Sequence, residues 1–113
     1  MGDHVMVLTT AGSDAQAEEL ARALVERRLA ACVNIVNDVC SVYRWKGEVE
    51  REAEKLLLIK TSRGLFPKLR DALRELHSYE LPEILMLPVL DGDPDYVKWL
   101  DDQLGVEPPD GER

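Results

Sequence analysis

A small set of side chains in this sequence has the chemistry of a binding site. Cys32 carries a thiol, His77 an imidazole and Glu83 a carboxylate, and these are groups that ligate divalent cations. Lys60 follows four apolar residues at the end of a predicted strand, where its ammonium can pair with a carboxylate such as Glu83 or bind an anion. These residues, together with Tyr79 beside His77, are the candidate ligand residues.

Each candidate also has a purely structural interpretation. Cys32 stands between Ala31 and Val33, which suits a small buried side chain as well as a thiol ligand or a redox group. His77 follows a predicted helix, whose C-terminal dipole stabilises an imidazolium. Arg28 is expected to cap the C-terminal end of the first helix.

The motifs of the common enzyme and zinc-site classes are missing from the sequence. It has no Cys-x-x-Cys pair, no His-Glu-x-x-His, no Gly-rich phosphate loop and no Ser/His/Asp spacing. The two cysteines, Cys32 and Cys40, would lie about 26 Å apart along a straight strand, which is too far for a disulfide. We therefore expect a protein that is not an enzyme.

The composition excludes several classes of partner. The 113 residues carry a net charge of −8 with a pI near 4.7, whereas nucleic-acid binding needs clustered Lys and Arg. No apolar run approaches the length of a membrane span, and no signal peptide is visible at the start of the sequence. These features predict a cytoplasmic protein that binds neither nucleic acid nor membrane.

The elements that must position the candidate residues centre on one long hairpin, from about Ala31 to Thr61. The segment 39–45 alternates with period two and places Tyr43 and Trp45 on one face, and Gly47 supplies a turn. At about 3.3 Å per residue each arm reaches about 45 Å, which is longer than the core of a chain this size can cover. The overhanging aromatic side chains are therefore expected to pack on another copy of the chain, with a ligand platform as the alternative.

The remaining pattern gives the fold. Ser13 starts a helix with Gln16 as the second half of a capping box, and Asp93-Pro94 starts a short closing helix. The other expected elements are strands over 4–9 and 83–90, the second of them at a sheet edge because of Pro88, and a helix over 64–76. The order β-α-β-β-α-β predicts an α+β, ferredoxin-like sandwich with an added C-terminal helix. We expect a single domain over 1–105 and a disordered acidic tail over 106–113.

Several segments together resemble the CutA divalent-cation tolerance proteins. They are Arg28–Val36, Ser41–Glu48, Leu57–Thr61, Phe66–Leu69, Leu76–Ile84 and Tyr96–Leu100. The resemblance runs from about Val5 to Leu104, and the motifs fall in the same order. It implies a ferredoxin-like fold, a compact homotrimer with an architecture related to the PII signal proteins, and an association with tolerance of copper and other divalent metals.

The resemblance also implies a metal site, which this sequence keeps only in part. In family members proposed to bind copper the ligands are a Cys at the end of the first strand and two adjacent His after the second helix. Thr9 stands at the Cys position, Leu76 at one His position and Ser78 at the Pro that usually follows, so only His77 matches. We therefore expect weak Cu(II) binding through His77, with help from Glu83.

Three functions follow from these observations. The first is a trimeric, non-enzymatic protein that binds copper or another divalent cation, with no cofactor needed for folding. The second is a PII-like sensor that binds a small anion or metabolite in a cleft between subunits, lined by Lys60, Glu83, Cys32 and Tyr79. The third is a trimeric scaffold that anchors another protein.

Overall fold

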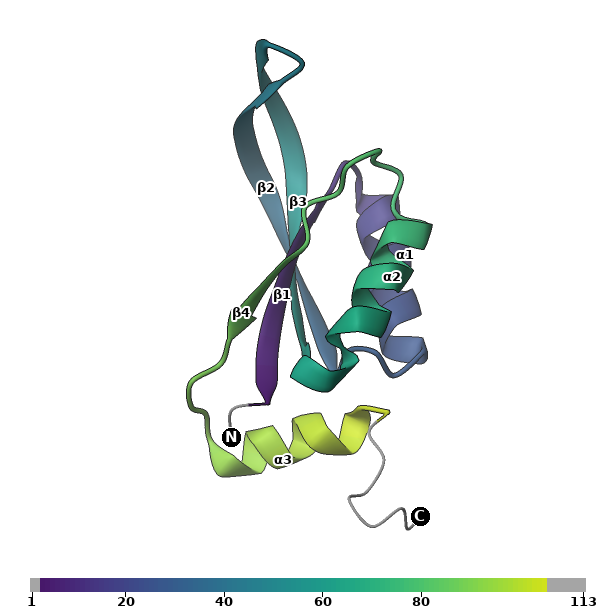
Figure 1. The fold of residues 1–113 in the computed structure, drawn as a ribbon, viewed down its shortest axis with the longest axis vertical. Helices are drawn as coiled ribbons and strands as arrows, with labels where there is room; N and C mark the ends of the chain where they lie inside the picture. Colours follow the sequence, from purple (N-terminus) through teal and green to yellow (C-terminus); the bar gives the residue numbers. More distant parts are fainter. Residues whose placement is uncertain (1–2, 106–113) are drawn as a thin grey trace.

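The computed structural model describes residues 3–105. Four strands and three α-helices follow one another along the chain, with a short 3-10 helix before the second α-helix (Figure 1). In order they are β1 (His4–Ala11), α1 (Asp14–Glu26), β2 (Cys32–Trp45), β3 (Glu48–Ser62), η1 (Arg63–Leu65), α2 (Phe66–Leu76), β4 (Leu85–Pro88) and α3 (Pro94–Gln103). The predicted tail over 106–113 lies outside the described residues.

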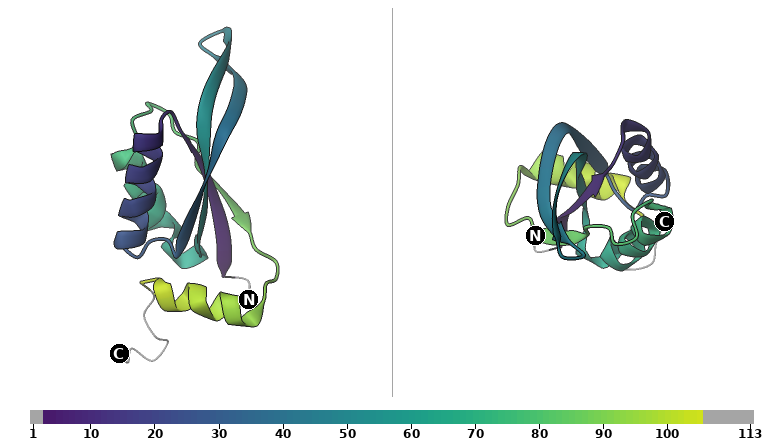
Figure 2. Two further views of the ribbon diagram at one scale, coloured as in Figure 1. Left: turned by 180° about the vertical axis from the view of Figure 1, so that it is seen from behind. Right: turned by 90° about the horizontal axis from the view of Figure 1, so that it is seen from above.

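The strands form one antiparallel sheet in the order β2-β3-β1-β4. Helices α1 and α2 lie side by side on one face of this sheet, and α3 crosses below the ends of the strands (Figures 1 and 2). This arrangement confirms the predicted α+β, ferredoxin-like fold with an added C-terminal helix.

The core lies between the sheet and the two helices. Alternate residues of the central strands are fully buried there, including Val5 and Val7 of β1 and Leu57 and Ile59 of β3. Each helix contributes an apolar stripe with helical spacing, and Leu20, Leu24, Leu69 and Leu73 in these stripes are at 0% exposure.

The long hairpin is present as predicted. Trp45 pairs with Glu48 across a two-residue loop, in which Lys46 and Gly47 have φ values of 51° and 85°. Two consecutive positive φ values are typical of a type I′ turn, whose twist matches that of the flanking strands. The upper part of the hairpin extends beyond the helices, and the molecule is 52 Å long (Figure 1).

A β-bulge in β2 decides which way the hairpin's side chains point. Val36 pairs with Leu56, but Val39 pairs with Glu54, so β2 has one extra residue between these two pairs. Asp38 takes a positive φ of 61° there. Because a shift of one residue exchanges the two faces of a strand, the bulge moves Tyr43 and Trp45 to the face opposite the helices.

The face opposite the helices carries large apolar side chains on all four strands. Leu8 of β1 lies between Leu58 of β3 and Leu85 of β4, and Met6 lies opposite Leu87. Met6, Leu8, Leu56 and Leu58 are half-buried, whereas Val36, Leu85 and Leu87 are exposed. We call these seven residues the open face.

Helix α3 is fixed to the ends of the strands by packing and polar contacts. Leu100 and Leu104 pack with Ala31 and Leu65 in a second small core. The predicted cap is present, because the Asp93 side chain accepts a hydrogen bond from the backbone N–H of Tyr96. His4 Nε2 lies 2.7 Å from Asp101 Oδ1, which ties α3 to the start of β1.

Some element boundaries differ from the prediction. β4 covers only Leu85–Pro88 rather than 83–90, although its position at the sheet edge is as predicted. α2 begins at Phe66 after a 3-10 turn rather than at Gly64. The capping box of α1 is half formed: the Ser13 hydroxyl accepts from the N–H of Gln16, but the Gln16 side chain bonds Glu19 and the N–H of Ser78 instead of Ser13.

Arg28 ends α1 through its backbone and not through its side chain. Its N–H donates to Val25 O and the N–H of Leu29 donates to Leu24 O, while Arg28 has a φ of 57°. This is a Schellman motif with an arginine at the position that glycine prefers. The predicted cap of α1 at Arg28 is therefore formed by its backbone, while the guanidinium reaches the last carbonyls of α3.

Candidate functional site

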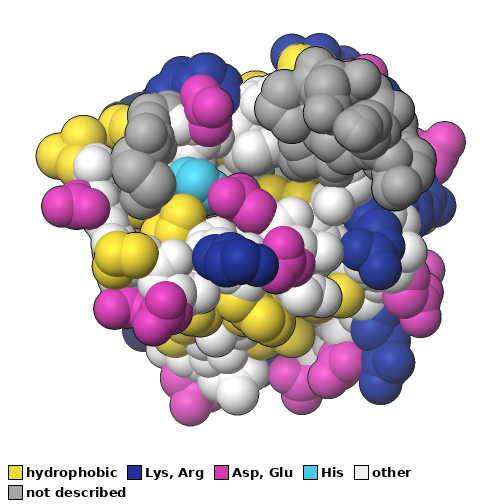
Figure 3. Space-filling view, turned by 90° about the horizontal axis from the view of Figure 1, so that it is seen from below, with side chains coloured by type: hydrophobic (Ala, Val, Ile, Leu, Met, Phe, Trp, Pro, Cys, Tyr) yellow, Lys and Arg dark blue, Asp and Glu magenta, His cyan; other side chains and the backbone are white. Residues whose placement is uncertain are grey.

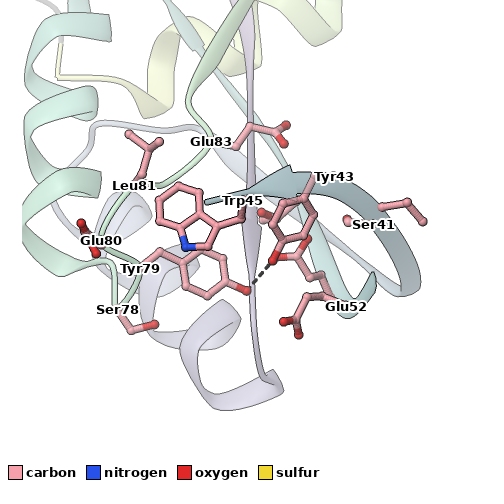
Figure 4. A pocket seen from close by; sticks show the side chains of 12 residues that line it. Ser41, Tyr43, Trp45, Glu52, Ser78, Tyr79, Glu80, Leu81 and Glu83 are labelled. Carbon is pink, nitrogen blue, oxygen red and sulfur yellow. Dashed lines mark hydrogen bonds between the residues drawn. The ribbon is translucent and has the colours of Figure 1, made fainter. Parts of the chain in front are cut away.

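A pocket of about 720 Å³ lies between the hairpin and the loop that follows α2. The hairpin contributes Ser41, Val42, Tyr43, Trp45, Glu52 and Glu54, the end of β1 contributes Thr10, and the loop contributes Ser78, Tyr79, Glu80, Leu81 and Glu83. Figure 4 shows the rings of Trp45, Tyr79 and Tyr43 gathered in the middle of this group.

One hydrogen bond joins the two walls of the pocket. The Tyr79 hydroxyl donates to Glu54 Oε2 over 2.6 Å, drawn as the dashed line in Figure 4. Glu54 is buried, with only 7% of its surface exposed. Burial, this hydrogen bond and the charge of Glu54 together raise the pKa of Tyr79 above its ordinary value, so the phenol remains protonated as the donor.

His77 lies behind this wall with both ring nitrogens in use. Its Nε2 donates to the backbone carbonyl of Thr10 over 2.6 Å, and its Nδ1 accepts from the backbone N–H of Tyr79 over 3.1 Å. Because Nδ1 is an acceptor here, the proton of the neutral ring is on Nε2. His77 is buried, and its ring packs 4.7 Å from that of Tyr79.

The aromatic residues of the hairpin share one face with its acidic residues. Ser41 pairs with Glu52 and Tyr43 with Glu50 across the hairpin, so their side chains lie together. Partial burial, followed by the charges of Glu52, Glu54 and Glu50, raises the pKa of Tyr43. The Lys46 ammonium lies 5.7 Å from the centroid of the Trp45 ring.

The structure brings Tyr79 and Glu83 into this pocket but places Lys60 and Cys32 elsewhere. Cys32 pairs with Lys60 at the other end of the sheet, about 20 Å along β3 from Glu54. There the Lys60 ammonium donates to the Tyr96 hydroxyl over 3.4 Å and lies 5.7 Å from the centre of that ring. The four proposed cleft residues of one chain therefore form two separate pairs.

A single chain does not present a ready-made copper site. Within residues 3–105, no three His, Cys, Asp or Glu side chains converge on one point at which a metal ion would sit. The imidazole of His77 has no free lone pair in this arrangement, and Thr9 at the end of β1 is buried on the helix side. The residues of one chain therefore do not fit a resident copper ion.

Two site residues were missed by the sequence reasoning. Glu52 and Glu54 were not among the candidate residues, although Glu54 is the partner of Tyr79 and both line the pocket. Their alternation with Arg51 and Ala53 indicates that they share one face of β3. The pairing of Glu54 with Tyr79 has no local signal in the sequence, because 25 residues separate the two partners.

The described residues on the surface around α3 carry charges of both signs. Figure 3, which looks at the molecule from the α3 end, shows acidic and basic side chains interspersed with small apolar patches. Nucleic acid needs a clustered basic surface, which this face does not offer. Among the described residues, no helix has the length and apolar character needed to cross a membrane.

Comparisons with known proteins agree with this fold. The chain matches the family described as CutA1 divalent ion tolerance protein over residues 5–103. It is 49% identical over 100 residues to the divalent-cation tolerance protein CutA of Thermus thermophilus, a match that covers 88% of this chain and 97% of that protein.

Solved structures give the same result. The structure of the Thermus thermophilus divalent cation tolerance protein superimposes with a TM-score of 0.88 at 48% identity, covering 90% of this chain and 99% of that one. A protein from Archaeoglobus fulgidus, described as a periplasmic divalent cation tolerance protein CutA, superimposes with a TM-score of 0.86 at 35% identity, covering 88% and 97%. The chain described here, with its ferredoxin-like sheet and extended hairpin, belongs to the CutA1 divalent ion tolerance family.

Proposed function

We propose that this chain acts as a homotrimer in tolerance of divalent cations, and that it acts by assembly and binding rather than by catalysis. The observation that carries this proposal is the open face of the sheet. A family of divalent-cation tolerance proteins supplies the link to cations, and the motifs of the common enzyme classes are missing from the sequence. A cytoplasmic location is part of the same proposal.

The open face has the properties of an unfilled subunit interface. Seven large apolar side chains run across four strands, no helix within residues 3–105 covers them, and the most exposed, Leu85, is 57% accessible. Contiguous apolar patches of this kind are rare on proteins that remain monomers. Covering the face with two other copies of the chain would remove it from water.

The two edges of the sheet support a cyclic assembly. β2 and β4 are the outer strands in the described sheet, so each leaves one row of backbone groups without a strand partner. A closed ring of subunits covers such edges and prevents uncontrolled strand pairing. The part of the hairpin that extends past the helices supports this assembly, because it offers a surface on which a neighbouring subunit could pack.

Binding of Cu(II) is proposed to be weak and to involve His77 with carboxylate help from Glu83. A metal that takes either nitrogen of His77 must displace the bond to Thr10 or the bond from Tyr79. Each such bond contributes about 1 kcal/mol of net stability, which the metal must offset. Because Thr9 and Leu76 also stand where the resemblance implies two further ligands, the proposed affinity is micromolar or looser.

Light scattering coupled to size exclusion tests the assembly. We expect the mass of three chains at micromolar concentration in a buffer that contains a chelator, since the proposed interface is apolar and needs no metal. A single-chain mass under these conditions would refute the trimer.

Calorimetric titration with Cu(II) tests the cation proposal separately. We expect micromolar or weaker binding that falls further in His77→Ala and Glu83→Gln, with Glu75→Gln as a control on the exposed surface of α2. Nanomolar binding that survives both substitutions would place the site elsewhere, with Cys32 and Cys40 as the next residues to test.

A further inference from the structure

We propose that the pocket between the hairpin and the α2–β4 loop binds a small organic ammonium ion, held by the aromatic faces of Trp45, Tyr43 and Tyr79 and by the surrounding carboxylates. The proposal concerns a ligand other than a metal ion. It also does not depend on cation tolerance, because the pocket is built from segments of one chain.

The first argument is the aromatic lining. Three of the twelve lining residues are aromatic, although aromatic residues make up only 5% of the sequence. Rings that surround a cavity attract a cation through the negative faces of their π systems, most strongly for tryptophan. The chain already shows this contact, because the Lys46 ammonium lies 5.7 Å from the centroid of the Trp45 ring.

The second argument is the sign of the charge. Glu52, Glu54, Glu80 and Glu83 line the pocket, and no Lys or Arg is among its lining residues. These carboxylates affect the tyrosines that line the pocket. Burial is the first cause of the raised pKa values of Tyr43 and Tyr79, and the negative charges of Glu52 and Glu54 raise both values further. An anion would therefore be repelled, and a cation attracted.

The third argument separates an organic cation from a metal ion. A divalent ion needs several oxygen atoms converging at 2.0–2.6 Å, by the general rule for Mg²⁺ and Ca²⁺, and the described residues hold no such group of three. Glu54 is also already committed to the Tyr79 hydroxyl. A quaternary ammonium needs no convergent ligands, because its charge is spread over methyl groups that pack on ring faces.

The size of the pocket fits a small metabolite. Its volume of about 720 Å³ lies in the range of roughly 300–1,000 Å³ that is usual for small-molecule sites. Both walls are fixed in place by the Tyr79–Glu54 hydrogen bond, so the site is formed before the ligand arrives.

Choline and its neutral carbon isostere, 3,3-dimethylbutanol, are the probes. Titration calorimetry is carried out on the full-length protein in phosphate buffer, because amine buffers would compete. We expect choline to bind about tenfold more tightly than the isostere, and its binding to weaken as salt is added. Equal binding of the two probes would show an apolar pocket only, and no binding of choline would overturn the proposal.

Variants locate the site. Trp45→Leu and Glu52→Gln should each weaken choline binding by about threefold to tenfold, whereas Trp99→Leu on the outer surface of α3 should not. If Trp45→Leu changes the size of the assembly, the comparison of Glu52→Gln with the Trp99→Leu control decides the assignment. Equal losses in the Trp99 control would overturn the assignment to this pocket.

Lys46→Asn gives the opposite prediction. It removes the tethered ammonium that lies over Trp45 and keeps a residue that tolerates the positive φ of the turn. Choline should then bind more tightly, because its competitor is gone. Weaker binding in this variant would mean that the face of Trp45 is not where the ammonium sits.

Discussion

The hydroxyl of Tyr79 donates a 2.6 Å hydrogen bond to the carboxylate of Glu54, and this contact fixes the loop after α2 against the middle of the hairpin. The carboxylate is buried, so it has little water to replace a lost donor. The same tyrosine also donates its backbone N–H to His77, whose ring bonds the end of β1. Tyr79 therefore links three parts of the chain that are remote in sequence.

Replacing Tyr79 by Phe should show how much the hydrogen bond to Glu54 contributes to stability. The variant keeps the ring but leaves Glu54 buried without its donor, which should lower the free energy of unfolding by about 1–3 kcal/mol. Tyr96→Phe is the matched control, because its hydroxyl makes a longer, exposed contact with Lys60. Urea unfolding measures the stability of both variants. Equal losses would show that the buried hydrogen bond contributes no more to stability than the exposed contact of Tyr96.

The same hydrogen bond predicts a dependence of stability on alkaline pH. The pKa of Tyr79 is raised in the folded chain, above a value of about 10 for an unfolded chain. Its contribution to stability is therefore fully present below about pH 10 and is lost as the pH rises above that value toward the folded pKa. Melting temperatures should fall above pH 10 less steeply in Tyr79→Phe than in the wild type. Parallel curves would contradict this reading.

Much of the fold could be predicted because its signals are local. Ser13 and Asp93 mark the starts of two helices through their own side chains, and Gly47 marks the turn of the hairpin. The period-two alternation of residues 39–45 correctly grouped Tyr43 with Trp45. These features depend on residues that are close in sequence, and tertiary contacts did not override them.

What could not be predicted depends on pairings between distant segments. The bulge at Asp38 selects the face on which Tyr43 and Trp45 lie, but it is defined only by the register against β3. The Nε2 atom of His77 is occupied by a hydrogen bond to the carbonyl of Thr10, which is 67 residues away in the sequence. The guanidinium of Arg28 likewise reaches carbonyls of α3 that are more than 70 residues away.

A charge on the open face should prevent assembly. Leu58 lies at the middle of this face, between Leu8 of β1 and Asn34 of β2. In Leu58→Asp the proposed interface would have to bury an unpaired carboxylate, which costs several kcal/mol by the general rule for buried charges. We expect a single-chain mass by light scattering, with a retained circular dichroism spectrum.

The control for this substitution is Val25→Asp. Val25 is 42% exposed on α1, in the helical layer on the other side of the sheet. It should leave the size of the assembly unchanged. Dissociation by both substitutions would mean that the open face is not the specific contact.

The positive φ of Arg28 predicts how glycine and alanine at this position will affect stability, and Arg27 serves as the control. At a φ of 57°, the backbone of Arg28 is in a region that glycine adopts at little cost and alanine does not. Both Arg28→Gly and Arg28→Ala lose the same guanidinium contacts with α3. The glycine variant should therefore be more stable than the alanine variant by about 1 kcal/mol.

At Arg27, where φ is −83°, the order should reverse, since alanine suits a helical backbone better than glycine. Thermal or urea unfolding of the four variants gives the two differences directly. Finding alanine the more stable at both positions would show that the Schellman geometry of Arg28 costs the chain nothing.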